Sequence, residues 1–514
     1  MKKSIALLLA CMLLITAFAA CSNTPADSSQ PQSSAASKPA ESKTESTSGS
    51  EPAETMKMTY VIPGDAPPEY DRGIKAINDK MAEDGVGVEA EFNYISWDVW
   101  DQKLNIMLST GEKFDAFHVM DDRVSLANYA SRGALADITD AMEQYGENIK
   151  ANVPELALTN GKIGGQQYGI PAFWVETALN EQATIRQDIL DKYNIPMPTN
   201  MEELTQAYIQ VMEQWDGDQL PYFPSVAVNE RLPYFFTSSD DFCVYSNVIY
   251  VNQDGTIANY FETEDFKEAA KNAKTWYDAG LINPDVLTFT QDQLSNQLNS
   301  GNWFVMNGTV GNVSGIQENI PDFKPENIAW LDLTNGAQQI RPYAVKNQQA
   351  VPLASEHPEA AVKFFNWVYT DQANFDLFMY GTEGVDYTLG ENRSYTPIID
   401  ATAGQALYSF SGWMGGNINF GYVDNNTAPD VNKHLYTIDE TAVDGIAAAF
   451  AFDASPVQTQ LADVQTVISS TLVPMAWGIT DYDSGIDAAL EMLKTAGVDD
   501  VIAEYQKQFE ESQK

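Results

Sequence analysis

The chain has 514 residues, with 29 Lys and Arg against 72 Asp and Glu, and a formal net charge of -43 at pH 7. Nucleic acid and anionic lipid both repel so acidic a chain, so neither is expected as a partner. The length exceeds what a single hydrophobic core usually holds and indicates two lobes or more.

The chain begins with a candidate export signal. Lys2 and Lys3 precede an apolar run over residues 5–20, too short to span a membrane comfortably and typical of a secretory signal peptide, predicted over 1–20. Ala19-Ala20-Cys21 resembles the lipobox of bacterial lipoproteins, whose Cys is lipidated and holds the protein on the membrane. We therefore expect a membrane contact through a lipid anchor on Cys21, at the outer face of the cell membrane. Ordinary secretion after cleavage nearby is the alternative.

A tether follows the predicted anchor. Residues 22–55 consist largely of Ser, Thr, Pro, Ala and Glu and contain no aromatic residue. Such a segment buries too little apolar surface to offset its conformational entropy, so 21–55 is expected to be lipidated Cys and disordered tether. Because Cys11 leaves with the signal and Cys21 is expected to be lipidated, Cys243 remains alone and no internal disulfide can form. We interpret Cys243 as a small buried residue and not as a nucleophile.

The segment from Tyr94 to Met120 is the centre of the predicted first lobe. A strand-like run over 86–94 precedes it, and an apolar, β-compatible run over 114–120 closes it. Between them lies a predicted helix whose apolar residues recur on one face, namely Trp100, Leu104, Met107 and Leu108. Ser96 or Asp98 is the expected N-cap, and Gly111 the left-handed residue that ends the helix. The order strand, helix, strand predicts a βαβ unit in a parallel sheet.

Polar and aromatic residues follow both strands of this unit. Trp97 and Asp98 come after the first strand, and Asp121 and Asp122 after the second. Ligands of such sheets bind beyond the carboxyl ends of the strands. An exposed Trp beside an Asp is what a sugar-binding cleft would need, so these four residues are candidate ligand contacts. Core packing is the alternative for Trp97.

The chain is expected to leave the first lobe near residues 168–174 and to return over 339–353. Pro171 argues against a central strand position, and Phe173 and Trp174 directly after it would face the cleft between the lobes. Interlobe packing is the alternative for Trp174. The predicted boundaries are as follows: first lobe 56–171 and 343–400, second lobe 172–342, second lobe and cleft loops 401–482, and C-terminal helices 483–514.

Two further tryptophans are candidate ligand contacts. Trp303 opens a predicted strand, and Trp413 lies in an aromatic, Gly-rich segment over 407–422 that is either a connector or a binding loop. Trp276 and Trp367 lie within predicted helices and are interpreted as core residues.

Several short motifs resemble those of one known family. They lie at 102–111, 114–115, 168–171 (Tyr-Gly-Ile-Pro), 276–284, 355–367, 380–384, 493–497 and 502–508. Each encodes mostly packing, but their order and spacing together are similar to those of the extracellular solute-binding proteins of bacterial ABC transporters. The likeness extends to the large lipoprotein branch of the oligosaccharide-binding family.

This resemblance implies an α/β, periplasmic-binding-protein-like fold. Two lobes, each a mainly parallel sheet flanked by helices, would be joined by a hinge and close on a solute. It implies a monomer that binds a small-molecule solute, expected to be an oligosaccharide, and delivers it to the permease subunits of an ABC importer. A binder of peptides or another polar solute is the alternative.

Enzyme motifs are absent from the sequence. It contains no His-Glu-x-x-His, Walker loop or Gly-x-Ser-x-Gly, and its three histidines have no metal-ligand spacing. The calcium-loop-like start at 481–485 has Ile486 and Met492 where Gly and Glu are needed. We therefore expect neither metal nor cofactor. A secreted glycoside hydrolase remains the enzyme alternative, because it too would use aromatic residues and paired carboxylates.

Overall fold

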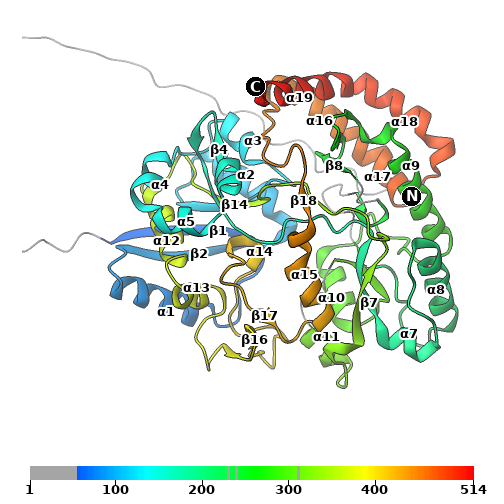
Figure 1. Ribbon diagram of the computed structural model, residues 1–514, viewed down its shortest axis with the longest axis horizontal. Coiled ribbons are helices and arrows are strands. Elements are labelled where there is room, and N and C mark those ends of the chain that lie inside the picture. Colours follow the sequence, from blue (N-terminus) through cyan, green and yellow to red (C-terminus); the bar gives the residue numbers. More distant parts are fainter. Residues whose placement is uncertain (1–54, 226, 228–231, 238–240, 309–312, 514) are drawn as a thin grey trace, which may run out of the picture. The chain divides into compact units, whose positions relative to one another are not determined.

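The computed structural model describes residues 55–225, 227, 232–237, 241–308 and 313–513 (Figure 1). The predicted signal peptide, Cys21 and all but the last residue of the predicted tether lie outside the described residues. Within the described ranges, no helix is both long and apolar enough to cross a membrane.

The first lobe is built on a five-stranded sheet. Its strands, in spatial order, are β2 (Val88–Ile95), β1 (Met56–Pro63), β3 (Ala116–Met120), β14 (Asn347–Ala350) and β6 (Gly169–Pro171). β1 pairs in parallel with β2 and β3, whereas β14 runs antiparallel to both β3 and β6. Because side chains alternate along a strand, Tyr60 and Val61 of β1 enter different hydrophobic clusters on the two faces of the sheet.

Helices cover both faces of this sheet. α1 (Tyr70–Glu83), α12 (Pro358–Val368) and α13 (Gln372–Met379) share a core with Tyr60, and α2 (Trp100–Thr110) and α3 (Leu126–Ser131) share one with Val61. The smaller elements before the second lobe are α4 (Thr139–Tyr145), α5 (Glu147–Asn152), α6 (Glu155–Asn160), β4 (Lys162–Ile163) and β5 (Gln166–Gln167). Those after the return are β15 (Tyr387–Leu389), β16 (Ser394–Pro397), α14 (Gly412–Gly415) and β17 (Val423–Asp424).

The predicted βαβ unit is confirmed as β2, α2 and β3. Gly111 ends α2 in the left-handed region with φ 67°, as expected. The predicted cap is wrong: a 3-10 turn, η1 (Trp97–Val99), precedes α2, so Ser96 and Asp98 lie ahead of the helix start and neither side chain caps it. β2 and β3 lie on opposite sides of β1, so the crossover passes over β1.

The second lobe contains two antiparallel sheets. One has the order β11 (Val305–Asn307), β7 (Gln182–Arg186), β12 (Ile328–Asp332), and the other β10 (Ile257–Asn259), β9 (Ile249–Asn252), β8 (Phe242–Tyr245). The expectation of a mainly parallel sheet is therefore wrong for this lobe. β8, β9 and β10 follow one another through short turns, which can join only antiparallel neighbours.

The second lobe is also rich in helices. They are α7 (Gln187–Tyr193), α8 (Met201–Gln214), α9 (Glu264–Asp278), α10 (Gln291–Ser300), α11 (Val313–Asn319), α15 (Pro429–Thr441), α16 (Gln458–Val467), α17 (Val473–Ala476), α18 (Tyr482–Ala496) and α19 (Val498–Ser512). Between α16 and α17 lies a π-helical turn, Ile468–Leu472. Short 3-10 turns lie at Tyr234–Phe236, Tyr260–Glu262, Pro325–Asn327 and Ser455–Val457. A two-stranded parallel pair is formed by β13 (Ile340–Arg341) and β18 (Val443–Asp444).

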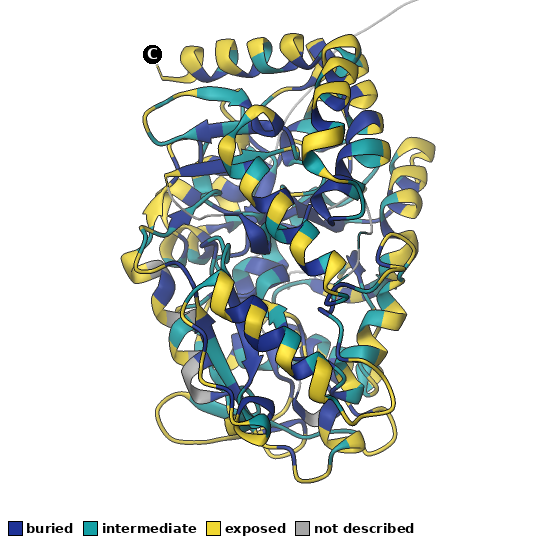
Figure 2. Cartoon of the chain, turned by 90° about the vertical axis from the view of Figure 1, so that its right-hand side faces the viewer, coloured by how far each residue is buried: buried dark blue, intermediate teal, exposed yellow. Residues whose placement is uncertain are grey.

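The core of the second lobe joins residues from distant parts of the chain. Trp276, a predicted core residue, is fully buried there, and Leu493 and Tyr505 of the C-terminal helices belong to the same cluster. In Figure 2 the helix that ends at the C-terminus has exposed residues along one side and buried residues along the other, as its period predicts. Trp367, the other predicted core tryptophan, is buried in the first lobe.

The chain passes between the two lobes near 172–181, 333–346 and 423–428 in its described part. The predicted domain boundaries stay predictions, but the packing differs from them in one segment. Tyr408, Phe410 and Met414, which were expected in the second lobe or in cleft loops, belong to the core of the first lobe.

Candidate functional site

The carboxyl ends of β2 and β3 open onto a cavity of about 1590 Å³. Its lining comes from both lobes, with Trp97 and Asp121 on the first and Tyr245 and Phe450 on the second. Sites for small molecules usually measure roughly 300–1,000 Å³, so this cavity has room for a larger solute.

Two tryptophans form an aromatic wall of the cavity. The ring centroids of Trp97 and Trp413 are 6.0 Å apart with an interplanar angle of 31°. The Arg123 guanidinium lies 5.4 Å from the Trp97 ring centroid and forms an ion pair of 2.6 Å with Asp101. Trp97, Trp413, Arg123 and Asp101 all line the cavity, so the wall combines flat apolar surface with polar groups.

A buried polar network supports Trp413. The His118 ring packs edge-on against Trp413 at 5.3 Å, and its nitrogens lie 3.3 Å from Gln349 Oε1 and 3.2 Å from Asn347 Oδ1. Gln349 Nε2 in turn donates to the carbonyl oxygen of Met414. Burial lowers the pKa of His118 to about 4, so the ring is neutral at neutral pH. These contacts hold α14, and Trp413 with it, against β14.

Trp174 lies half-buried at the cavity, in a slot made of glycines. A Cβ atom on Gly412 would lie 2.5 Å from Trp174 Cζ2, and one on Gly421 would lie 3.3 Å from the same ring. Gly416 packs against the ring as well. The Gly-rich segment predicted as a connector or binding loop therefore packs against Trp174 and also carries Trp413 into the cavity lining.

The predicted carboxylates lie in different surroundings. Asp98 and Asp122 are exposed and line the cavity. Asp121 also lines it, but its Oδ1 accepts from the Leu126 N–H at 2.6 Å and its Oδ2 from Gln348 Nε2 at 3.0 Å. Burial raises the pKa of Asp121 to about 7, against the opposing effect of these hydrogen bonds. Asp121 thus has a structural task at the start of α3 besides its place in the lining.

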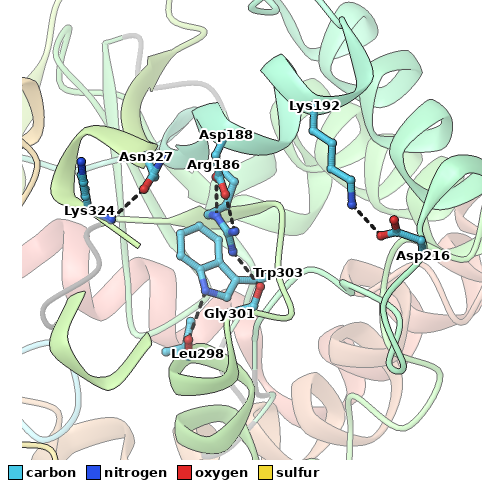
Figure 3. A network of polar contacts seen from close by, with 9 residues as sticks. All are labelled: Arg186, Asp188, Lys192, Asp216, Leu298, Gly301, Trp303, Lys324 and Asn327. Atoms are coloured by element: carbon cyan, nitrogen blue, oxygen red, sulfur yellow. Dashed lines mark hydrogen bonds and ion pairs between the residues drawn. The ribbon is translucent and has the colours of Figure 1, made fainter. Parts of the chain in front are cut away.

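Two predicted contacts lie outside the cavity. Trp303 is 0% exposed beneath Arg186, and its Nε1 donates to the Leu298 carbonyl at 3.2 Å (Figure 3). The chain after α10 folds Trp303 back onto that helix, so its side chain enters the second lobe. Phe173 packs on the core of the first lobe, where its carbonyl accepts from the Ile418 N–H at 2.8 Å. Neither residue is among those that line the cavity, so their placement in it was wrong.

The structure adds lining residues that the sequence did not single out. Arg123 directly follows Asp122, so the strand-end argument could have found it. Tyr422 ends the segment 407–422, which the sequence analysis gave as a connector or binding loop. The others come from loops and from the short strands β16 and β17, with no local signal, and include Glu176, Tyr395, Asp424, Phe450 and Phe452. Burial raises the pKa of Asp424 to about 6.

Cys243 also lines the cavity. Cys243 is buried, as interpreted, and burial raises the pKa of its thiol to about 12, which suppresses the nucleophilic thiolate. Among the residues that the structure describes, no group of three or more His, Cys, Asp or Glu is placed to hold a metal ion.

Comparison with known proteins finds two family models along the chain. Residues 67–375 match the model described as Bacterial extracellular solute-binding protein. Residues 446–514 match a model described as a domain of unknown function, DUF3502.

Among curated proteins, the chain is similar to two from Streptococcus pneumoniae serotype 4. It is 25% identical over 480 residues to a carbohydrate ABC transporter substrate-binding protein, covering 91% of this chain and 93% of that protein. It is 26% identical over 212 residues to the fructooligosaccharide ABC transporter substrate-binding protein FusA, covering 36% of this chain and 37% of FusA.

Solved structures share the fold. The N-glycan transport solute binding protein NgtS from Streptococcus pneumoniae, in complex with Man1GlcNAc, matches with a TM-score of 0.72 at 20% identity. The match covers 88% of this chain and 99% of NgtS. FusA in complex with kestose matches with a TM-score of 0.62 at 16% identity, over 89% of this chain and 99% of FusA.

Proposed function

Because the chain belongs to the bacterial extracellular solute-binding proteins, we propose that it captures an oligosaccharide in this cavity and delivers it to an ABC importer. The observation that carries the proposal is the wall formed by Trp97 and Trp413, 6.0 Å apart in a cavity of about 1590 Å³. Sugars present apolar C–H faces and a rim of hydroxyls, which such rings and nearby polar groups complement. The relative that matches 91% of this chain is a carbohydrate ABC transporter substrate-binding protein, and this likeness supports a carbohydrate as the solute.

The charges of the lining favour a solute without acidic groups. Lining carboxyl groups outnumber lining cations even without Asp121 and Asp424, whose pKa values burial raises: the others are Asp98, Asp101, Asp122 and Glu176, against Arg123, Arg132 and Lys346. Arg123 is already engaged with Asp101 and Trp97. A uronic acid chain would meet like charges here, which cost binding energy, whereas a neutral oligosaccharide would not.

For delivery, the conformation of the solute-loaded protein must differ from that of the empty protein. The segments near 172–181, 333–346 and 423–428 that join the two cores are the candidate hinge. A solute that touches both lobes stabilises a closed state by its differential affinity for that state. The permease subunits of the importer would then recognise the closed form of a monomer.

The proposed location follows from the N-terminal sequence. A lipid on Cys21 and the tether after it would keep the folded body at the outer face of the membrane, near the importer. Cys21→Ala should release the body into the medium with its affinity for the solute unchanged. Retention of that variant on the membrane would contradict the lipid anchor.

Calorimetry with paired saccharides tests the proposal. We expect neutral oligosaccharides to bind with one site per chain and without bond cleavage, and oligouronates of equal length to bind at least about 10-fold more weakly. A thermal-shift screen that also contains peptides and polyols finds the best solute, because saturation at 100 times Kd stabilises by about 2.7 kcal/mol. Binding of peptides alone would overturn the proposal, and cleaved product would support the glycoside hydrolase instead.

A further inference from the structure

The C-terminal segment 446–514, which matches the domain of unknown function, is part of the second lobe. Its helices α16, α17, α18 and α19 (orange to red in Figure 1) pack with one another and against α9. Val464, Leu493 and Phe509 of the segment share one hydrophobic core with Trp276. Stability alone would explain such packing, so a role in binding needs a different observation.

That observation is an aromatic cluster that lines the cavity. Phe450, Phe452 and Tyr505, here called the C-terminal aromatic cluster, are all among the lining residues. The ring of Tyr505 lies 5.1 Å from that of Phe450 and 5.1 Å from that of Phe452. Tyr505 is 2% exposed and belongs to the core, whereas Phe450 and Phe452 stay half-buried. Two rings with open surface thus rest on a buried third ring.

The cluster is braced from two sides. Gln508 Nε2 donates to the Asp453 carbonyl at 2.8 Å, and Gln508 Oε1 accepts from the Asp453 N–H at 3.0 Å, which ties the loop that carries the rings to α19. Tyr245 stacks on Tyr505 at 6.2 Å and donates from its hydroxyl to the Pro342 carbonyl at 2.6 Å. Groups held this firmly lose little freedom when a ligand binds.

The cluster lines the same cavity as the aromatic wall of the first lobe. Tyr343, on a segment that joins the two cores, lies 5.5 Å from Tyr245 and lines the same cavity. The Ala344 N–H donates to the Ala448 carbonyl at 2.8 Å, so the joining segment and the C-terminal segment are hydrogen-bonded directly. One cavity thus has the Trp97 and Trp413 wall on one lobe and a second aromatic surface on the other.

We propose that segment 446–514 supplies a second sugar subsite, in which Phe450 and Phe452 contact a distal residue of the same oligosaccharide. This inference rests on the proposed function and extends it. A solute long enough to touch both aromatic surfaces gains binding energy that a short one does not. The C-terminal segment therefore selects for chain length.

The test uses the full chain and one neutral oligosaccharide series, from the disaccharide to the hexasaccharide, by calorimetry. Phe452→Leu keeps an apolar side chain at the site but removes the ring. We expect it to lose about 10-fold in affinity for the longest members and to leave the disaccharide unaffected. Phe452→Ala should show the same dependence on length, more strongly.

Phe509→Ala is the matched control. Its ring contacts Phe450 at 5.5 Å but is not among the lining residues, so the variant should melt earlier and keep the ratio of long to short affinities. If the Phe452 variants lost affinity equally for oligosaccharides of all lengths, or if neither lost affinity, the second subsite would be overturned. The proposed function would still stand. A wild-type protein that binds no saccharide of any length would overturn both.

Discussion

The indole rings of Trp97 and Trp413 face one another across 6.0 Å, although one follows the second strand of the chain and the other lies beyond its last return to the first lobe. Trp413 and Trp303 were both candidate ligand contacts from the sequence, but the structure predicts different effects of replacing them. Trp413→Ala removes a half-buried ring from the cavity and should weaken oligosaccharide binding by roughly 30-fold. Trp303→Ala removes a core ring and should cost about 3–5 kcal/mol of stability without changing affinity.

Calorimetry and denaturant titration on the same two variants separate these effects. A Trp413 variant that binds as tightly as the wild type would contradict its assignment to the site. A Trp303 variant that loses affinity while its unfolding midpoint stays constant would contradict its assignment to the core.

The glycine slot predicts a graded response at Trp174. Gly412→Ala places a Cβ 2.5 Å from Trp174 Cζ2, so the ring must move, whereas Gly421→Ala approaches the ring only to 3.3 Å. Overpacking of this kind costs about 1–3 kcal/mol, and a displaced lining residue weakens binding. We expect Gly412→Ala to lower both the melting temperature and the affinity, and Gly421→Ala to lower them less. Equal behaviour of the two variants in thermal-shift and calorimetric measurements would count against this slot.

An ion pair between the half-buried Arg72 and the buried Asp386 fixes α1 to the chain after α13. Arg72 Nη1 and Nη2 donate to Asp386 at 2.7 and 2.5 Å, and the Asp386 side chain is fully buried. Arg72→Ala leaves that carboxylate without its two-pronged partner and should cost about 3–5 kcal/mol of unfolding free energy. Lys75→Ala, on the same helix but in an exposed pair with Asp79, should cost less than about 1 kcal/mol. Urea unfolding of both variants checks the prediction, and similar losses would refute it.

Asp121 makes stability depend on pH. Its pKa is raised from 3.8 to about 7 by burial, so between these values the folded chain binds more protons than the unfolded chain. The free energy of unfolding therefore decreases as the pH rises from about 4 to about 7. Asp121→Asn keeps an oxygen for the Leu126 N–H and removes this contribution. Melting temperatures from pH 4 to pH 8 should then fall less steeply than in the wild type, and parallel curves would argue against a raised pKa.

Local pattern predicted the parts of the fold that local forces determine. The apolar spacing of α2, the left-handed Gly111 and the flanking strands were readable because each depends on near neighbours in the sequence. The edge of the sheet where the cavity opens followed from the same unit, since strand polarity fixes where loops gather. Trp97, Asp98, Asp121 and Asp122 accordingly line the cavity.

Contacts between distant segments were not readable in this way. The residues around Trp303 do not indicate that its side chain faces the core. Those around Trp413 do not indicate that Trp97 is its neighbour. The antiparallel pairing of β7 with β11 and β12 depends on how long connections return, which the spacing of apolar residues does not encode. Phe450 and Phe452 looked like ordinary apolar residues because their cavity exists only once both lobes are assembled.

Each of the two cores combines residues from distant parts of the chain, and this has a consequence for biosynthesis. The first core needs Tyr60 near the N-terminus and also Phe410 and Met414, and the second needs Ile185 together with Phe509. Neither core can therefore close while the ribosome is still making the middle of the chain. Long-range contacts of this kind delay folding until late in synthesis. A nascent chain that stays unfolded for so long can still cross a membrane as an extended polypeptide, which is the state that such passage requires.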